Sequence, residues 1–127
     1  MDRKVIKTEK APLAIGPYSV AIKVENLAFT SGQIGLDPTT QMLVQGGVQA
    51  ETRQALNNLK QVLLAAGSDL ERVVKTTVFL KDMSDFQAMN SVYAEFFPVD
   101  PPARSAVAAA GLPRSACVEI EAIAIME

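Results

Sequence analysis

The sequence predicts one α+β domain spanning residues 1–127, in which two helices cover one face of a β-sheet. Three observations lead to this prediction. Two segments carry apolar residues at helical spacing, other segments alternate or are rich in β-branched residues, and two helical stripes can cover only one face of such a sheet. A chain of 127 residues buries roughly two-thirds of its unfolded surface, which is enough for a core without disulfides.

The N-terminal part of the chain predicts three strands followed by a loop. Residues 3–7 form a short candidate strand, and residues 19–34 indicate two strands around a tight turn at Glu25-Asn26. Residues 35–47 hold Gly, Pro, Asp and Thr at the density typical of turns. We therefore expect residues 35–47 to be irregular.

A long helix is predicted from Val48 to Gly67. Gly67 suits the left-handed position that follows many helices. The apolar stripe of this helix comprises Thr52, Ala55, Leu56, Leu59, Val62, Leu63 and Ala66. Residues 71–81 then predict a β-branched strand, with Val74, Thr76, Val78 and Leu80 on one face and Val73, Lys75, Thr77 and Phe79 on the other.

The second helix is predicted to begin near Ser84, because Ser84 and Gln87 have the spacing of a capping box. Its apolar side comprises Phe86, Met89, Tyr93, Phe96 and Phe97, and it ends before Pro98, Pro101 and Pro102. Two further strands follow, at residues 103–110 and 117–126, separated by a turn at residues 111–115.

The last strand carries two acidic residues on a mostly apolar face. Alternation puts Glu119 and Glu121 on the same face as Ile123 and Ile125, opposite Val118, Ile120, Ala122, Ala124 and Met126. The two helices can cover only one of these faces. We therefore predict a homo-oligomer whose subunit contacts involve the other face, with polar residues at its edges available for a site.

Composition argues against several classes of function. The 12 basic and 14 acidic residues give a net charge of −2, which is not the electrostatic footprint of a nucleic-acid binder. The chain starts with charged residues and has no run of about 18 apolar residues, so we expect a soluble cytoplasmic protein with no membrane partner. With no histidine and a single cysteine, a Ser-His or Cys-His nucleophile and a zinc site of the usual ligands are excluded. No cofactor is expected.

Arg104 is the main candidate for binding chemistry. It lies where a proline-stiffened segment enters a strand, and small residues flank it. The planar guanidinium group matches a carboxylate with two parallel hydrogen bonds, so Arg104 suits a small carboxylic acid. The alternative is purely structural, with Arg104 forming an ion pair with Glu119 or Glu121.

The other candidates have plain structural alternatives. Tyr18 follows a Gly-Pro turn, where its phenol either overhangs a cleft or packs half-buried. Asn90 lies between apolar positions of the second helix and is otherwise an exposed or capping amide. The segment SGQIG, residues 31–35, resembles no phosphate-binding loop and is interpreted as a turn. Cys117 has no activating neighbour in sequence and is interpreted as a small core residue.

Six segments in order carry a resemblance to a known family: APLAIGPYS, FTSGQIGLDP, VVKTTVFLKDMSDFQAMNSVYAEFF, PPARSAV, GLP and VEIEAIAI. Together they resemble the RidA branch of the reactive intermediate deaminases, also called the YjgF/L-PSP family, from end to end. The resemblance implies a chorismate-mutase-like fold, in which a mixed six-stranded sheet carries two helices on one face. It also implies a homotrimer.

The resemblance further implies an activity, the hydrolysis of 2-imino acids such as 2-iminobutanoate and 2-iminopropanoate to 2-oxo acids and ammonia. In that assignment Arg104 holds the substrate carboxylate, and Glu119 positions or activates the attacking water. The backbone of Ala106 accepts a hydrogen bond from the imine nitrogen. Tyr18, Ser31, Gly32 and Asn90 match positions that line the cleft, some of them contributed by a neighbouring subunit. Glu121 is interpreted as structural or as part of the subunit contact.

Two positions depart from the family pattern. Many members have Cys where this chain has Ala106, but a backbone carbonyl does not depend on the side chain. Many also have an aromatic residue where this chain has Pro101, and its loss would reshape one wall of the cleft.

Two alternatives to the deaminase hypothesis come from other functional classes. One is a module that binds a small carboxylate without turning it over. The other is an RNA-directed translation inhibitor or ribonuclease, as described for some members of the family, which the negative charge and the absence of histidine argue against.

Overall fold

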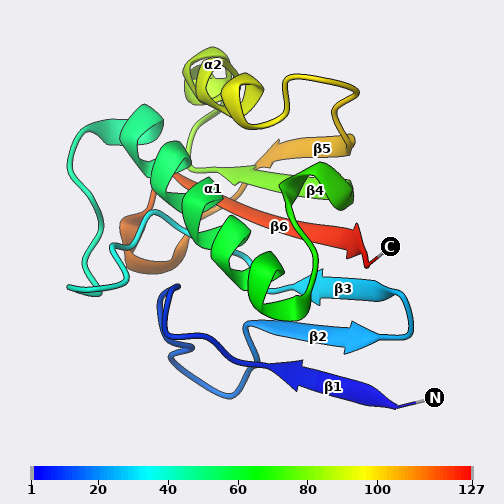
Figure 1. The fold of residues 1–127 in the computed structure, drawn as a ribbon. Coiled ribbons are helices and arrows are strands. Elements are labelled where there is room, and N and C mark those ends of the chain that lie inside the picture. Colours follow the sequence, from blue (N-terminus) through cyan, green and yellow to red (C-terminus); the bar gives the residue numbers. More distant parts are fainter. Residues whose placement is uncertain (1, 127) are drawn as a thin grey trace.

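The computed structural model describes residues 2–126 and has a mixed six-stranded sheet with two α-helices on one face (Figure 1). This confirms the predicted α+β class and layer order. The strands are β1 Arg3–Ile6, β2 Ala21–Val24, β3 Leu27–Thr30, β4 Val73–Leu80, β5 Ala103–Ala108 and β6 Val118–Ile125. The helices are α1 Gly47–Ala66 and α2 Phe86–Phe96, with short 3-10 turns at Leu70–Arg72, Met83–Asp85 and Pro113–Ser115.

The C-terminal strand lies in the middle of the sheet. The strand order is β1-β2-β3-β6-β4-β5, and every neighbouring pair is antiparallel except β4 and β5. That parallel pair is joined through α2, as parallel strands require a crossover (Figure 1). β6 therefore inserts between β3 and β4, which brings Glu119 and Glu121 to the centre of the sheet rather than to an edge.

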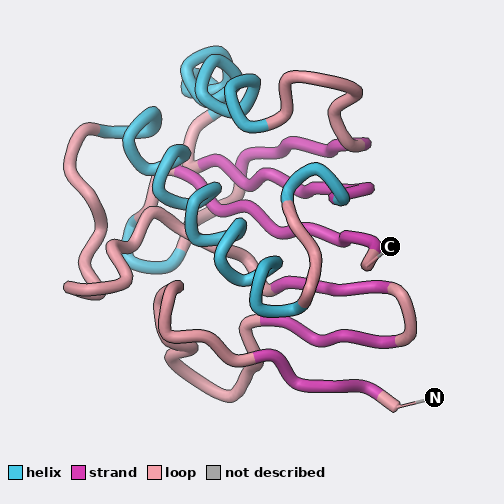
Figure 2. Tube along the Cα trace, viewed as in Figure 1, coloured by secondary structure: helices cyan, strands magenta, loops and turns pink. Residues whose placement is uncertain are grey.

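The two helices pack on the same face, and together they build the core (Figure 2). Every residue of the predicted α1 stripe is buried, and Gly67 ends the helix with a positive φ of 92°. The face of β6 that contains Val118 and Ile120 packs beneath these helices. Within residues 2–126, neither helix combines the length and the apolar character needed to cross a membrane.

The predicted capping box at the start of the second helix is wrong. A 3-10 turn, Met83–Asp85, precedes α2, and the side chain of Asp82 accepts a hydrogen bond from the Ser84 N–H at 2.9 Å. α2 begins only at Phe86, without a side-chain cap. The Asp82 carboxylate thus satisfies the Ser84 N–H at the start of this turn, and Ser84 is inside the turn rather than before it.

The predicted alternation of β4 fails at its first two residues. Val73 is buried and Val74 is 43% exposed, the reverse of the expected order relative to Thr76. The cause is an irregularity in the pairing with β6 between Val73 and Lys75, which shifts the side chains by one residue. This irregularity directly follows the 3-10 turn Leu70–Arg72, which also shortens the predicted strand.

The sheet face opposite the helices carries an apolar patch that is uncovered within residues 2–126. Neighbouring strands place Ile22, Phe29 and Ile123 side by side across this face. The side chains of Phe29, Val107 and Ile125 are each at least 40% exposed. Contiguous apolar area of this kind is typical of a contact surface, so the predicted association through the sheet retains its physical basis.

A buried amide fastens the loop after β3 to α1. Asn58, fully buried on α1, donates from Nδ2 to the carbonyl oxygens of Ile34 at 3.1 Å and Leu36 at 2.8 Å. Gly35 lies between them, and a Cβ at Gly35 would come within 2.7 Å of the Glu51 Cα. Helix and loop are thus in close contact, and this fixes the path of the chain as it leaves β3.

Replacing Asn58 with Ala is expected to destabilise the protein by about 1–3 kcal/mol, because the Leu36 carbonyl oxygen loses its donor while the Ile34 carbonyl oxygen keeps only the Leu36 N–H. Urea unfolding measures the free energy of unfolding. Asn57→Ala is the matched control, since Asn57 is exposed on the same helix and the substitution has the same effect on helix propensity. Equal stability of the two variants would contradict the assigned role of Asn58.

Candidate functional site

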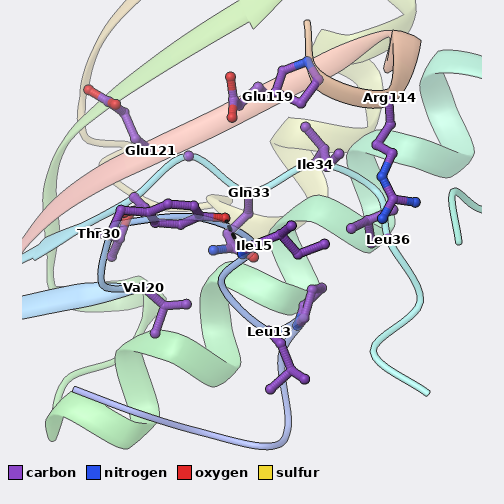
Figure 3. Close-up of a pocket in the computed structure, with 15 residues that line it drawn as sticks. Leu13, Ile15, Val20, Thr30, Gln33, Ile34, Leu36, Arg114, Glu119 and Glu121 are labelled. Atoms are coloured by element: carbon purple, nitrogen blue, oxygen red, sulfur yellow. Dashed lines mark hydrogen bonds between the residues drawn. The ribbon is translucent and has the colours of Figure 1, made fainter. Parts of the chain in front are cut away.

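A pocket of about 650 Å³ opens beside β6, at the end of the sheet where the chain leaves β3 (Figure 3). Residues 12–20 and 30–36 form most of its wall, and Arg114, Glu119 and Glu121 complete it. Figure 3 shows Glu119 and Glu121 projecting from β6, while Arg114 extends toward Leu36. The wall is otherwise largely apolar, with Leu13, Ile15, Ile34 and Leu36. Such a mixture of apolar wall and a few polar groups is typical of a small-molecule site.

Glu119 is the half-buried acid of this pocket. Burial raises the pKa of its carboxyl group, and the negative charge of Glu121 raises it further. Gly32 leaves room for this carboxyl group, because a Cβ at Gly32 would lie 2.6 Å from Glu119 Oε2. The pocket therefore holds a carboxyl group that binds its proton more tightly than an exposed glutamate does, and such a group in a cleft is a candidate for acid–base chemistry.

Tyr18 and Ser31 line the same pocket. The Ser31 hydroxyl donates to the Ser19 carbonyl oxygen at 2.6 Å, which ties the end of β3 to the segment before β2. The Tyr18 phenol oxygen accepts a hydrogen bond from the Ile15 N–H at 3.3 Å, and the side chain is 50% exposed. Tyr18 thus overhangs the pocket as one of its two interpretations predicts.

Arg104 lies in a different place, at the outer edge of the sheet beneath α2. Its Nη1 donates to Asn90 Oδ1 at 2.7 Å. The guanidinium carbon lies 4.8 Å from the ring centre of Tyr93 and 5.5 Å from that of Phe86. Among residues 2–126, Asn90 supplies the one hydrogen-bond partner found for this guanidinium group. Its other N–H donors make no hydrogen bond to residues 2–126.

The structural alternative for Arg104, an ion pair with Glu119 or Glu121, is wrong within this chain. Arg104 is in register with Thr76 on β4, and Thr76 is paired with Ala122 on β6, so these three side chains share the helix-covered face. Glu119 is paired with Phe79, on the uncovered face. Strand alternation therefore places Arg104 and the two glutamates on opposite sides of the sheet.

Asn90 is neither an exposed amide nor a cap, which corrects its structural alternative. It lies one turn after Phe86 and one turn before Tyr93, so all three face Arg104 from α2. Ala106 follows Arg104 on the same strand. The Ala109 N–H donates to the Leu80 carbonyl oxygen of β4, so alternation along the strand turns the backbone N–H and C=O of Ala106 away from β4, toward the open edge.

The predicted site residues therefore fall into two groups. We call Tyr18, Ser31, Gly32 and Glu119 the acid group, and Asn90, Arg104 and Ala106 the arginine group. The acid group lines the pocket, whereas the arginine group does not contribute to it. Sequence reasoning missed Arg114 as a lining residue and Tyr93 as a partner of Arg104. The spacing of Phe86, Asn90 and Tyr93 was the available signal for the second.

Cys117 does not act as a reactive thiol in this arrangement. Its thiol pKa is raised to about 11, first by burial and then by the nearby Glu51 carboxylate. Glu51 Oε1 also accepts the Cys117 backbone N–H at 2.8 Å. A thiol that stays protonated near neutral pH is not a nucleophile, which agrees with the structural interpretation of this residue, although Cys117 is only partly buried.

Comparison with known proteins identifies the family. The family model for endoribonuclease L-PSP matches residues 8–126. The chain belongs to this L-PSP (Rid) family. This confirms the resemblance found in the sequence.

The similar proteins include enzymes and solved structures. The chain is 55% identical to a 2-iminobutanoate/2-iminopropanoate deaminase of Mus musculus, over 97% of this chain and 91% of that protein. It is 51% identical to the Homo sapiens protein of the same name, over 97% and 90% of the two chains. A putative endoribonuclease of Thermotoga maritima is 52% identical and superposes with a TM-score of 0.94 over 98% of both chains. The YjgF gene product of E. coli superposes with a TM-score of 0.93 at 45% identity, over 98% of this chain and 99% of that one.

Replacing Glu121 with Gln is expected to lower the pKa of Glu119. The substitution removes the repulsion between two carboxylates, so ionisation of Glu119 becomes easier; its pKa stays above the ordinary value because burial is the larger cause. Carboxyl ¹³C chemical shifts followed across a pH titration measure this pKa. Glu71→Gln, an exposed glutamate away from the pocket, is the control and leaves the Glu119 titration in place. An unchanged midpoint in Glu121→Gln would contradict the electrostatic coupling.

Proposed function

We propose that this protein hydrolyses 2-imino acids, such as 2-iminobutanoate and 2-iminopropanoate, to 2-oxo acids and ammonia in the cytoplasm, without a cofactor. The observation that carries the proposal is the Arg104 guanidinium group, which Asn90 and two aromatic rings orient. Within residues 2–126 it forms no ion pair with an acidic side chain. The sequence is 55% and 51% identical to two proteins named as deaminases for these substrates, which supports the same activity.

The active site is formed between subunits of a homotrimer in this proposal. Glu119 and Arg104 point to opposite faces of one sheet, so one copy of the chain cannot close the acid group and the arginine group around one small molecule. The uncovered apolar face offers the contact through which copies associate. The arginine group of one subunit would then meet the acid group of the next.

The reaction needs one carboxylate-binding cation, one acid–base group and one water. Arg104 binds the substrate carboxylate, and the outward-facing Ala106 carbonyl oxygen accepts a hydrogen bond from the imine N–H. The oxygen of a water adds to the carbon of the protonated imine while Glu119 takes one of the water's protons, and the C=N π electrons move to nitrogen. The resulting tetrahedral intermediate carries both hydroxyl and amine on that carbon. Glu119 then gives its proton to the amine nitrogen, the C–N bond breaks and ammonia leaves, and the hydroxyl group loses its proton to the Glu119 carboxylate as the C=O bond of the 2-oxo acid forms.

These groups are sufficient because the substrate is already electrophilic. A protonated imine beside a carboxylate hydrolyses in water unaided, so positioning and one base provide the required acceleration. The raised pKa of Glu119 suits both steps, since the same carboxyl group first accepts and then donates a proton.

The family description as endoribonuclease raises RNA cleavage as a second candidate function. This chain offers little for it. It has a net charge of −2 and no histidine, and two carboxylates in its pocket would repel a phosphodiester backbone.

Two substitutions separate catalysis from binding alone. Arg104→Ala is expected to lower kcat/KM by roughly 10²-fold or more and to abolish binding of 2-oxobutanoate, because the carboxylate loses its bidentate partner. Glu119→Gln is expected to lower kcat by roughly 10²–10⁴-fold while 2-oxobutanoate still binds. The assay generates 2-iminobutanoate with a threonine dehydratase and follows its loss, and calorimetry measures binding.

Arg3→Ala serves as the control for the loss of a cation, because Arg3 is exposed on the edge strand β1, which is at the far side of the sheet from β5. Ultracentrifugation verifies that the trimer persists in each variant. Unchanged ammonia release in Arg104→Ala would rule out the proposed function, and unchanged turnover in Glu119→Gln would remove Glu119 from the mechanism.

Gly32→Ala is expected to reduce turnover by displacing the Glu119 carboxyl group. The added Cβ would lie 2.6 Å from Oε2 and 2.7 Å from Cδ of Glu119, so the side chain must move while the fold persists. The matched control is Gly111→Ala, because a Cβ at Gly111 meets no atom within 4 Å. The same dehydratase-coupled assay compares the two. Equal activity of both variants would show that the Glu119 position is not critical.

A further inference from the structure

Two aromatic rings of α2 lie against the Arg104 guanidinium group, and neither has a role in the proposed reaction. The Tyr93 ring centre is the nearer, at 4.8 Å from the guanidinium carbon, and the Phe86 ring lies at 5.5 Å. Asn90, between them on the same helix face, binds Nη1. Arg104 extends from an edge strand, so α2 supplies its lateral support.

Tyr93 itself is held more firmly than a packing residue requires. Its ring is 6% exposed and lies 4.7 Å from the Phe97 ring, centre to centre. Its hydroxyl forms a buried hydrogen bond of 2.7 Å with Thr76 Oγ1. Thr76 is fully buried and is the β4 partner of Arg104 in the sheet register. One strand pair therefore fixes both the base of Arg104 and the far end of the ring against which its guanidinium lies.

We propose that Tyr93 is a positioning residue for the reaction, which anchors the Arg104 guanidinium group through its ring and thereby sets the affinity for the substrate carboxylate. This inference rests on the proposed function. The ring attracts the cation electrostatically, and burial strengthens such contacts. Burial raises the pKa of the Tyr93 phenol, so the side chain stays neutral and its ionisation plays no part in this role. Thr76 assists by holding the ring.

The role predicts a particular kinetic effect. The carboxylate is bound in both the ground state and the transition state, so a loosened Arg104 raises KM more than it lowers kcat. Tyr93→Leu is expected to raise KM for 2-iminobutanoate roughly three- to thirty-fold, with kcat within about three-fold of its original value. Tyr93→Phe retains the ring and is expected to keep KM within about three-fold, although it destabilises the fold by leaving Thr76 without its partner.

Val62→Ala is the control for destabilisation. Val62 is fully buried on α1, in the second core cluster with Ile6, Val20 and Ala28, on the β1–β3 side of the sheet. The substitution lowers stability without contact to the arginine group, so KM stays unchanged. If Tyr93 were merely structural, Tyr93→Leu and Val62→Ala would match in KM at equal loss of stability, and this result would overturn the proposal.

An NMR measurement that needs no turnover, and a second substitution, complete the test. The ¹⁵N order parameter of the Arg104 Nε–H is expected to fall in Tyr93→Leu and to persist in Tyr93→Phe and Val62→Ala; an unchanged value overturns the inference even if the protein were no deaminase. Absence of turnover in the unmodified protein would contradict the proposed function alone. Should Tyr93→Leu not fold, Tyr93→Met replaces it, because a flexible methionine fills more of the space of the ring while still removing the aromatic face next to the cation. An unchanged KM and order parameter in that variant would also overturn the proposal.

Discussion

The alternation of side chains along β6 is the constraint on which the rest of the molecule depends. One face of this strand, from Val118 to Ala124, supplies the centre of the core, and the other face carries Glu119 and Glu121. Because β6 lies between β3 and β4, both glutamates are held at the middle of a sheet and away from its edges. A shift of one residue would bury two carboxylates beneath the helices, so the core enforces the register of the acid.

The same alternation explains why the arginine and the acid are separated. Arg104 occupies the helix-covered side of an edge strand, where α2 supplies an amide and two rings. Glu119 occupies the other side, where the loop before β2, the loop after β3 and the turn with Arg114 surround its pocket. The Arg104 cation and the half-buried Glu119 carboxyl group thus lie on separate surfaces of the chain. In the proposed homotrimer both groups act in one reaction, and association through the sheet also removes its apolar face from water.

Much of the fold could be predicted from the sequence because its strongest signals are periodic. The α1 stripe and the two faces of β6 follow from spacing alone, and the structure confirms both. Predictions failed where a local contact overrode a pattern. Asp82 rather than Ser84 caps the turn before α2, and a bulge reverses Val73 and Val74. The spacing of Ser84 and Gln87 does not reveal that Asp82 binds the turn, and the alternation of β4 does not reveal a bulge at its start.

The candidate site could be predicted only in part, for a related reason. Residue type and motif singled out Arg104, Glu119 and Asn90, but pairing Arg104 with a glutamate required knowledge of strand order, which residue spacing does not provide. Buried polar groups were also missed, since Asn58 and Glu51 flank the apolar stripe of α1 and are buried only because the loop after β3 lies over them.

The electrostatics of Glu119 shows the cost that this arrangement imposes on the fold. A carboxyl group with a pKa raised in the folded state binds its proton more tightly there than in the unfolded chain, so its ionisation opposes folding. The sign follows directly. Below the unfolded-state pKa both states are protonated and the group is neutral in its effect, whereas above the folded-state pKa the full penalty is present. Glu121, on the same face, increases that penalty rather than relieving it. A sequence selected for stability alone would place a neutral or apolar residue at one of these positions, as at Ile123 on the same face. Two carboxyl groups on one face beside a pocket, with a glycine that makes room for one of them, do not stabilise the fold, and this supports the proposed use of Glu119 in catalysis.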